Sequence, residues 1–363
     1  MKVAYRDLRI KDPALKAELL AAVDRVLSHG RILLGPEHAE FEAAVAKQCG
    51  RKHAIGVNSG SDALFLALRA LDVGPGDEVI TTALSWIATA NAITLTGAKP
   101  VFVDIGDDLN IDAARIEAAI TPRTRAIAPV HFTGQLCDIE TILAIAQRRG
   151  LHVVEDAAQA YGANRNGRIA GSFGTLSAFS MNPMKVLNAF GEAGCIVTDD
   201  DALRDKLVAL RYNGTINRHD CKWPGLNGRL DTMQAAMLLV MLKHVPAKIE
   251  AKRRIARLYD ERLDNVVRCP RENPGNYHTY YAYTVQCDRR DGLMQFLGER
   301  GVETQIQHPI AMPDHTAYKN GASFDVPNAR RLVNEILALP NQEDLTPAEL
   351  DHVCNSVSEF YAA

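Results

Sequence analysis

The sequence has no pair of cysteines with the spacing of a metal-binding or redox motif. Its seven cysteines are scattered along the chain, and their number is odd. Zinc sites use closely spaced cysteines, and secreted disulfide frameworks use an even number of them. We therefore expect reduced, mostly buried thiols, and no spacing of His, Cys and Asp predicts a metal site.

Long apolar runs and an excess of basic residues are missing as well. No stretch approaches the roughly 20 apolar residues that a membrane-spanning helix needs. Residues 1–10 carry charges where a signal peptide has an apolar core. The formal net charge is −3, whereas proteins that bind nucleic acids or membrane surfaces carry a basic excess. We expect a cytoplasmic protein that binds neither a nucleic acid nor a membrane.

The composition is that of a globular protein, because 47% of the 363 residues are hydrophobic and 23% are charged. This length suits a large domain plus a smaller one. We predict an N-terminal helical segment at 1–30, a large α/β domain at 31–246, and a linking helix with a small C-terminal α+β domain at 247–363. In the last part we expect strands at 280–285 and 302–306 and a helix at 328–339.

The large domain alternates strands with apolar-periodic helices. Strands are expected at 53–57, 78–81, 99–104, 126–130 and 151–155. This alternation predicts an α/β fold with a mostly parallel central sheet and helices on both faces. In such sheets, ligands bind at the carboxyl ends of the strands.

Ser59, Gly60 and Ser61 lie between the first strand and an apolar helix at 63–71. Free backbone N–H groups and the positive end of the helix dipole meet at such a turn, which suits a phosphate. Strand–turn–helix sequences with Gly and Ser are common in α/β proteins, however, and Asp62 could simply cap the helix.

Two charged residues are candidates for chemistry. Asp156 follows the strand at 151–155, so its carboxylate could hold a cationic ring nitrogen or act as a helix N-cap. Lys185 lies among apolar and small polar residues. An amine whose ammonium form is disfavoured becomes a nucleophile near neutral pH, so Lys185 could form a Schiff base. A surface lysine in a loop is the alternative.

A phosphate turn, a carboxylate and a lysine together meet the needs of pyridoxal 5′-phosphate (PLP). This cofactor has a phosphate, a ring nitrogen that must stay protonated, and an aldehyde that an amine holds. Trp86 lies near the end of a further strand and offers an aromatic surface for the ring.

Longer motifs occur in a fixed order along the chain. They are Asn58-Ser-Gly-Ser-Asp-Ala-Leu64, Gly74-Pro-Gly-Asp-Glu-Val79, Ile87-Ala-Thr-Ala-Asn91, Gly97-Ala-Lys-Pro-Val-Phe-Val-Asp104, Glu155-Asp-Ala-Ala-Gln-Ala160, Gly171-Ser-Phe-Gly174, Ser180-x4-Lys185, Leu226-Asn-Gly-Arg-Leu-Asp231 and Gln234-Ala-Ala236. With these motifs the sequence resembles the DegT/DnrJ/EryC1/StrS family of PLP-dependent sugar aminotransferases, which have the fold-type I architecture of aspartate aminotransferase. The resemblance covers nearly the whole chain.

The resemblance implies roles for the matching residues. Lys185 forms the internal aldimine with PLP and acts as the proton shuttle. Asp156 pairs with the pyridinium nitrogen, Gln159 lies by the ring hydroxyl, and Trp86 stacks on the ring. The residues implied to bind the phosphate are Ser59, Gly60, Ser61 and Ser180.

The resemblance also implies a homodimer with active sites shared between subunits. Asn227 lies in a long polar loop at 211–229 and would reach the phosphate in the other subunit. Arg229, in the same loop, would lie on the substrate side. Asn182 and His308 are further candidates for contacts with the substrate.

The implied reaction is transamination from L-glutamate to a keto carbon of a nucleotide-linked deoxysugar. A PLP-dependent dehydratase, a cyclitol aminotransferase and a non-catalytic regulator with the same fold are alternatives. Lys185 argues against the branch of the family that has histidine at this position and performs dehydration. Asn182 and Met184 differ from the residues usual beside the family's lysine, so we expect a different substrate geometry.

Overall fold

The computed structural model describes residues 1–217, 219–319 and 323–362. Its central sheet has seven strands in the order β1-β9-β8-β5-β4-β2-β3. β9 runs antiparallel to β1 and β8, and the remaining neighbouring pairs are parallel. The strands are β1 (His53–Val57), β2 (Glu78–Thr82), β3 (Lys99–Val103), β4 (Thr124–Ala128), β5 (His152–Asp156), β8 (Leu176–Ser180) and β9 (Gly194–Thr198). The predicted fold, with a mostly parallel central sheet, is confirmed.

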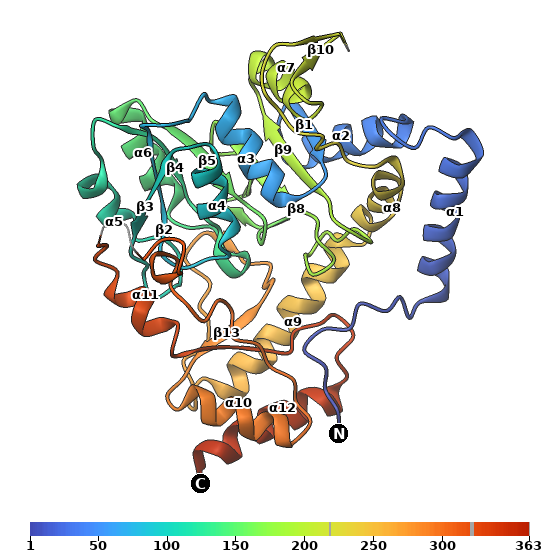
Figure 1. The fold of residues 1–363 in the computed structure, drawn as a ribbon. Coiled ribbons are helices and arrows are strands. Elements are labelled where there is room, and N and C mark those ends of the chain that lie inside the picture. The colour runs from blue at the N-terminus through green and yellow to red at the C-terminus, as the bar shows by residue number, and fades with distance from the viewer. Residues whose placement is uncertain (218, 320–322, 363) are drawn as a thin grey trace.

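Helices cover both faces of this sheet (Figure 1). Successive strand residues point to opposite sides, so Ala126 and Ala128 pack in one apolar cluster and Ile127 packs in another. The first side is covered by α3 (Gly60–Ala70), α4 (Ala88–Leu95) and α7 (Asp201–Leu210). The second is covered by α2 (Pro36–Gln48), α5 (Ala113–Ile116), α6 (Ile139–Arg149) and α8 (Thr232–Leu242). Because both faces are buried, the strands are nearly continuous apolar runs.

The C-terminal part has an apolar core of its own. The helix α9 (Val245–Leu263) leads into it, and β13 (Tyr283–Gln286) pairs antiparallel with β14 (Ile336–Leu339). Buried side chains of α9, α10 (Arg290–Glu299) and α12 (Pro347–Ala362) pack against this pair. The short strands β12 (Asn276–Tyr277), β6 (Asn164–Arg165) and β7 (Arg168–Ile169) form a separate small sheet, and β10 (Thr215–Ile216) pairs with β11 (Asp220–Cys221).

The predicted helix at 328–339 is wrong. The helix α11 (Pro327–Leu332) ends early, and the residues that follow the next turn form β14. All four residues of β14 are buried, and a short apolar run of this kind cannot be assigned to a helix or a strand from its periodicity alone. The strand expected at 302–306 is reduced to isolated bridges at Val302 and Gln305.

The N-terminal segment touches both parts of the chain. Val3 forms a bridge with Val302 and is fully buried in the C-terminal core. The helix α1 (Pro13–His29) packs instead against α8 of the large part. The domain limits at 30/31 and 246/247 stay predictions. None of the helices within the described residues combines the length and the apolar character needed to cross a membrane.

Candidate active site

A cavity of about 570 Å³ opens where the parallel strands end. Its lining combines the turn between β1 and α3, the residues before α4, the ends of β5 and β8, and a C-terminal loop. The lining residues are Ser59, Gly60, Ser61, Leu64, Ser85, Trp86, Ala88, Asp156, Ala158, Gln159, Ser180, Asn182, Met184, Lys185, Glu192, Tyr281, Gln305, Ile306, Gln307, His308 and Pro309. The structure thus brings together every predicted site residue except Asn227 and Arg229.

The turn after β1 leaves two backbone donors at the start of α3. Ser59 is the N-cap of this helix, and its hydroxyl accepts a hydrogen bond from the Asp62 N–H at 3.1 Å. Ser59, and not Asp62, therefore caps the helix. The N–H groups of Gly60 and Ser61 precede the first N–H that the helix can satisfy, so they are available to an anion in the cavity.

Gly60 also allows α3 to approach the end of β8. A Cβ atom at this position would lie 2.5 Å from the Cβ atom of Ser180. This close approach places the Ser180 hydroxyl beside the helix N-terminus, so both can contact one phosphate.

Asp156 is the last residue of β5 and is 4% exposed. Its carboxylate accepts hydrogen bonds from the Thr89 hydroxyl at 2.7 Å and from the Ala158 N–H at 3.1 Å. Burial raises the pKa of Asp156, and the bond from Thr89 offsets part of this shift. Turns follow this residue rather than a helix, so the helix-cap alternative is wrong. A cation against this buried carboxylate would favour its ionised form.

Gln159 is held by a backbone segment in an unusual conformation. Its side-chain oxygen accepts a hydrogen bond from the Thr133 N–H at 2.9 Å. Thr133 has a φ of 56°, which is rare for a β-branched residue and costs free energy. Such strain is often found at functional sites, but no sequence pattern marks it here in advance.

Lys185 lies in the cavity, so the alternative of a surface lysine is wrong. Its Nζ atom is 4.6 Å from the centroid of the Tyr281 ring. Burial tends to raise the pKa of Tyr281, but the charges of Lys185 and Arg6 outweigh it and lower that pKa. The prediction missed Tyr281, whose place in the expected strand at 280–285 gave no sign that it faces the lysine.

Asn182 shapes the loop that carries Lys185. Its backbone oxygen accepts from the Lys185 N–H at 2.8 Å, and its side-chain oxygen accepts from the Met184 N–H at 3.0 Å. Its side-chain nitrogen donates to Glu192 at 2.7 Å. Glu192 lines the cavity as well and was not predicted. A contact between Asn182 and the substrate remains a prediction.

Trp86 and His308 form one rim of the cavity. Their ring centroids are 5.8 Å apart, and Trp86 is 60% exposed. The Nε2 atom of His308 is buried and has no hydrogen-bond partner among the described residues. Burial, followed by the charges of Lys185 and His315, lowers the pKa of His308 to about 4. A neutral imidazole is therefore available to a ligand.

Asn227 and Arg229 lie away from the cavity of their own chain. The Arg229 guanidinium donates to the Asn227 side-chain oxygen at 2.9 and 3.2 Å and lies 4.4 Å from the Tyr212 ring centroid. Asn227 is exposed. A contact with the site of a partner subunit remains a prediction for both residues.

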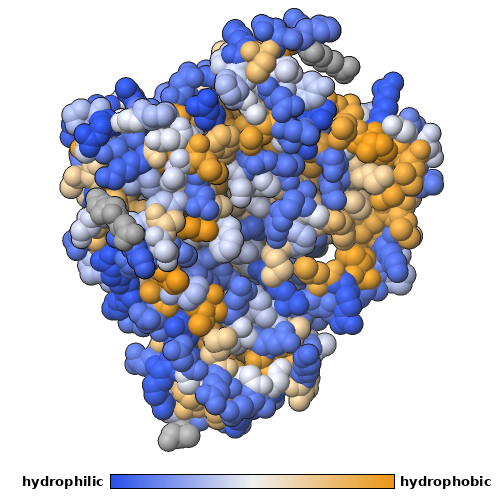
Figure 2. Space-filling view, in the orientation of Figure 1, coloured by the Kyte–Doolittle hydropathy of each residue, from blue (hydrophilic) through white to orange (hydrophobic). Residues whose placement is uncertain are grey.

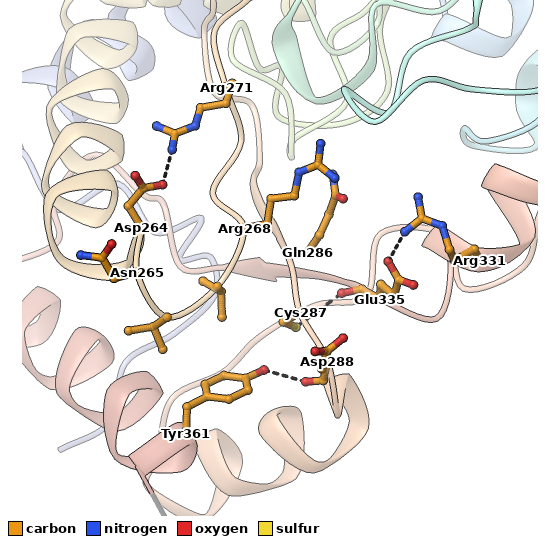
Figure 3. A pocket seen from close by; sticks show the side chains of 12 residues that line it. Asp264, Asn265, Arg268, Arg271, Gln286, Cys287, Asp288, Arg331, Glu335 and Tyr361 are labelled. Atoms are coloured by element: carbon orange, nitrogen blue, oxygen red, sulfur yellow. Dashed lines mark hydrogen bonds and ion pairs between the residues drawn. The ribbon is translucent and has the colours of Figure 1, made fainter.

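A second cavity, of about 540 Å³, lies in the C-terminal part (Figure 3). Three arginines line this cavity, and each of them pairs with a carboxylate. Arg271 pairs with Asp264, Arg331 with Glu335, and Arg268 with Asp107. Because these charges are balanced, the described lining residues of this cavity offer no free cation for an anionic ligand.

Comparisons with known proteins extend over almost the whole chain. The model of the DegT/DnrJ/EryC1/StrS aminotransferase family matches residues 13–358. A "Pleiotropic regulatory protein" from Geobacillus stearothermophilus is 42% identical over 99% of this chain and 99% of its own length. The dTDP-3-amino-3,4,6-trideoxy-alpha-D-glucose transaminase of Streptomyces venezuelae is 40% identical over 99% of this chain and 96% of its own length.

A solved structure supports the same relationship. NtdA from Bacillus subtilis, with bound cofactor PMP, is 28% identical and superposes with a TM-score of 0.94 over 100% of this chain and 86% of NtdA. With matches of this extent in both sequence and structure, the chain belongs to the DegT/DnrJ/EryC1/StrS aminotransferase family and is an aminotransferase.

Proposed function

We propose that this protein uses PLP to transfer an amino group from L-glutamate to a keto carbon of a nucleotide-linked deoxysugar. One observation carries the proposal: a helix N-terminus, a buried carboxylate and a lysine line a single cavity. Those three groups match the phosphate, the ring nitrogen and the aldehyde of PLP. PMP bound to NtdA and the sugar substrate named for the Streptomyces relative agree with this fit.

The chain's own residues account for binding of the cofactor. The N–H groups of Gly60 and Ser61, together with the Ser180 hydroxyl, would hold the phosphate. Asp156 would hold the protonated ring nitrogen, and Lys185 would form the covalent imine. When bound, PLP supplies an electron sink for the carbon that loses its proton.

Lys185 would act as the base once its amine is released. The free amine would accept the Cα proton of the amino donor and donate it to the carbon on the other side of the imine nitrogen. The complete reaction exchanges an amino group for a keto oxygen between the two substrates, so it needs no oxidant and no reductant. The buried Asp156 carboxylate would keep the ring nitrogen of the cofactor protonated throughout.

The charges of the cavity support shared sites in a homodimer. Among the described lining residues, Lys185 carries the only amine and there is no arginine, whereas Asp156 and Glu192 carry carboxyl groups. Both L-glutamate and a sugar nucleotide are anionic, so a further cation is needed. Arg229 of a second copy would supply it, and Asn227 of that copy would reach the phosphate.

The surface around α1 supports a second copy as well. Figure 2 shows apolar surface gathered on the side of the molecule that carries α1. The exposed apolar side chains of α1 and the following turn are Leu20, Leu27, Ile32, Leu33 and Leu34. An exposed apolar patch of this kind is typical of an interface between subunits.

Replacement of Lys185 tests the proposal. Lys185→Ala should lose the visible absorbance of the imine, and turnover should fall by at least ~10²-fold because the base is gone. Lys52→Ala is a control, since Lys52 is exposed and lies outside the cavity. Turnover and absorbance that survive in Lys185→Ala would show that the assignment is wrong.

Product analysis separates the proposed reaction from its alternatives. With a nucleotide-linked keto sugar and L-glutamate, transamination adds nitrogen to the sugar, whereas a dehydratase removes oxygen and adds no nitrogen. A cyclitol aminotransferase would aminate a keto cyclitol in preference to the sugar nucleotide.

A regulatory role is the second candidate, because the Geobacillus relative carries a regulatory name. Failure of the protein to bind PLP would favour this role over catalysis.

A further inference from the structure

Residues 1–6 connect the C-terminal core to the loop of Lys185. The Val3 N–H donates to the Gly301 oxygen at 2.8 Å, and the Glu303 N–H donates to the Val3 oxygen at 2.9 Å. Two residues further, the Tyr5 hydroxyl accepts a hydrogen bond from the Gln307 side chain at 2.9 Å. These contacts fix the direction in which the chain reaches Arg6.

Arg6 joins the two segments that flank the Lys185 amine. One guanidinium nitrogen donates to the backbone oxygen of Met184, the residue before Lys185. A second nitrogen donates to the backbone oxygen of Tyr281 at 2.7 Å. The guanidinium carbon lies 4.6 Å from the Tyr281 ring centroid, and the Lys185 Nζ atom is also 4.6 Å from that centroid.

The geometry suits an arginine in particular. Its planar fork can donate to two carbonyl groups at once, whereas the ammonium of a lysine has no such fixed geometry. The lysine loop and the Tyr281 segment are joined to Arg6 across 178 and 275 residues of sequence, respectively. Among the described residues, no side chain other than Arg6 donates to both carbonyl oxygens.

We propose that Arg6 is a positioning residue, which holds Lys185 against Tyr281 so that the amine is ready to form the covalent imine. This inference rests on the proposed function. Arg6 does not line the cavity, so it acts on the reaction through the Met184 and Tyr281 backbones. An N-terminal segment that only fills space would not affect the reactivity of the lysine in particular.

The rate of imine formation provides a readout separate from turnover. In the cofactor-free protein, the Lys185 amine adds to the PLP aldehyde and one water leaves, so C=N replaces C=O without any redox change. The appearance of the visible band after mixing with PLP measures this step. Arg6→Ala should slow it by at least ~10-fold, as expected for the loss of charge-assisted hydrogen bonds.

Two further variants define the contribution of the fork. Arg6→Lys keeps the charge but should restore less than half of the lost rate. Arg9→Ala is the matched control in the same segment, because Arg9 is exposed and pairs only with Asp7 among the described residues. It should match the wild-type rate within about twofold. Circular dichroism and thermal midpoints should show that all three variants fold.

The closing measurement is a double-mutant comparison in a Lys185→Ala background. There, Arg6→Ala should leave the non-covalent affinity for PLP unchanged, since the residue that Arg6 positions is absent. An equal loss of PLP affinity in both backgrounds, or a rate equal to wild type in Arg6→Ala, would overturn the role of Arg6 alone. A wild-type protein that forms no imine would overturn the proposed function, and this inference with it.

Discussion

The adjacent carboxylates Glu155 and Asp156 respond to burial in opposite ways. Burial tends to raise the pKa of Glu155, but the bond and charge of His131 and the bonds from Gly174 and Ser177 outweigh it and lower that pKa to about 2. Asp156 accepts fewer hydrogen bonds, and its pKa is raised by burial. These neighbouring residues of β5 therefore differ in role. Hydrogen bonds within the protein stabilise the ionised form of Glu155, whereas a cation would be needed to stabilise the ionised form of Asp156.

Glu155 should make folding sensitive to acid. Its pKa is about 2 in the folded protein against a usual value of 4.5. The ionised form therefore stabilises the fold above pH 4.5, and this contribution is lost as the pH falls from 4.5 toward 2. Glu155→Gln should cost about 3–5 kcal/mol at pH 7, because it leaves His131 and several N–H groups unsatisfied.

Urea unfolding between pH 3 and pH 7 measures this effect. The wild-type protein should lose stability steeply at the acid end, and Glu155→Gln should show a smaller dependence on pH. Glu359→Gln is the control, since its ion pair with Arg300 is exposed and contributes less than about 1 kcal/mol. Equal pH dependence in wild type and Glu155→Gln would contradict the assignment.

At the scale of elements, the start of α3 depends on its contact with the end of β8. The helix begins at Gly60, three residues before the start at residue 63 that its apolar pattern predicts. Ser59 caps the helix at this earlier start, and Gly60 can then lie directly against Ser180, where a side chain would collide. The proposed phosphate site is therefore a product of two elements packed together.

Gly60→Ala should separate these elements. The added Cβ atom would lie 2.5 Å from the Ser180 Cβ atom, so α3 must shift. The Gly60 and Ser61 N–H groups would then no longer point at the proposed phosphate position. We expect a loss of about 1–3 kcal/mol in stability and at least ~10-fold weaker binding of PLP, as one charge-assisted hydrogen bond is lost.

A second helical glycine serves as the control for this change. Gly298 in α10 has no atom within 4 Å of a built Cβ atom, so Gly298→Ala should leave PLP affinity unchanged and stabilise the protein slightly. Fluorescence titration with PLP and thermal unfolding would check both variants. Unchanged PLP affinity in Gly60→Ala would show that the phosphate binds elsewhere.

At the scale of the whole molecule, the proposed dimer predicts that two inactive variants can complement each other. Lys185→Ala lacks the amine, and Asn227→Ala lacks the phosphate contact that would come from the partner. A mixed dimer has one site with an intact Lys185 and an intact Asn227. Random mixing at equal amounts should restore about a quarter of wild-type activity, because half the dimers are mixed and each has one intact site.

Co-expression with two different tags measures this restoration. A third change, Leu27→Asp on the exposed face of α1, should prevent restoration by dissociating the subunits. Activity of the mixture that equals the sum of the separate variants would show that each chain completes its own site. Sedimentation then gives the oligomeric state of each sample.

Much of the architecture follows from local patterns in the sequence. The large part could be predicted because alternating strands and helices repeat, and because the carboxyl ends of parallel strands meet at one edge. That rule alone brings Ser59, Asp156 and Ser180 together. Local periodicity fails for 328–339, because the apolar run Ile336–Leu339 has no period that separates a helix from a strand.

The sequence by itself thus determined the large part's fold class and offered candidate residues for the chemistry, since periodicity and turn preferences act over a few neighbouring residues. Only the tertiary structure decided what surrounds those residues. The ring of Tyr281 beside Lys185, the strained Thr133 behind Gln159, and the bridge from Arg6 join segments far apart in the chain. Such contacts depend on how whole elements pack, and no local pattern encodes them.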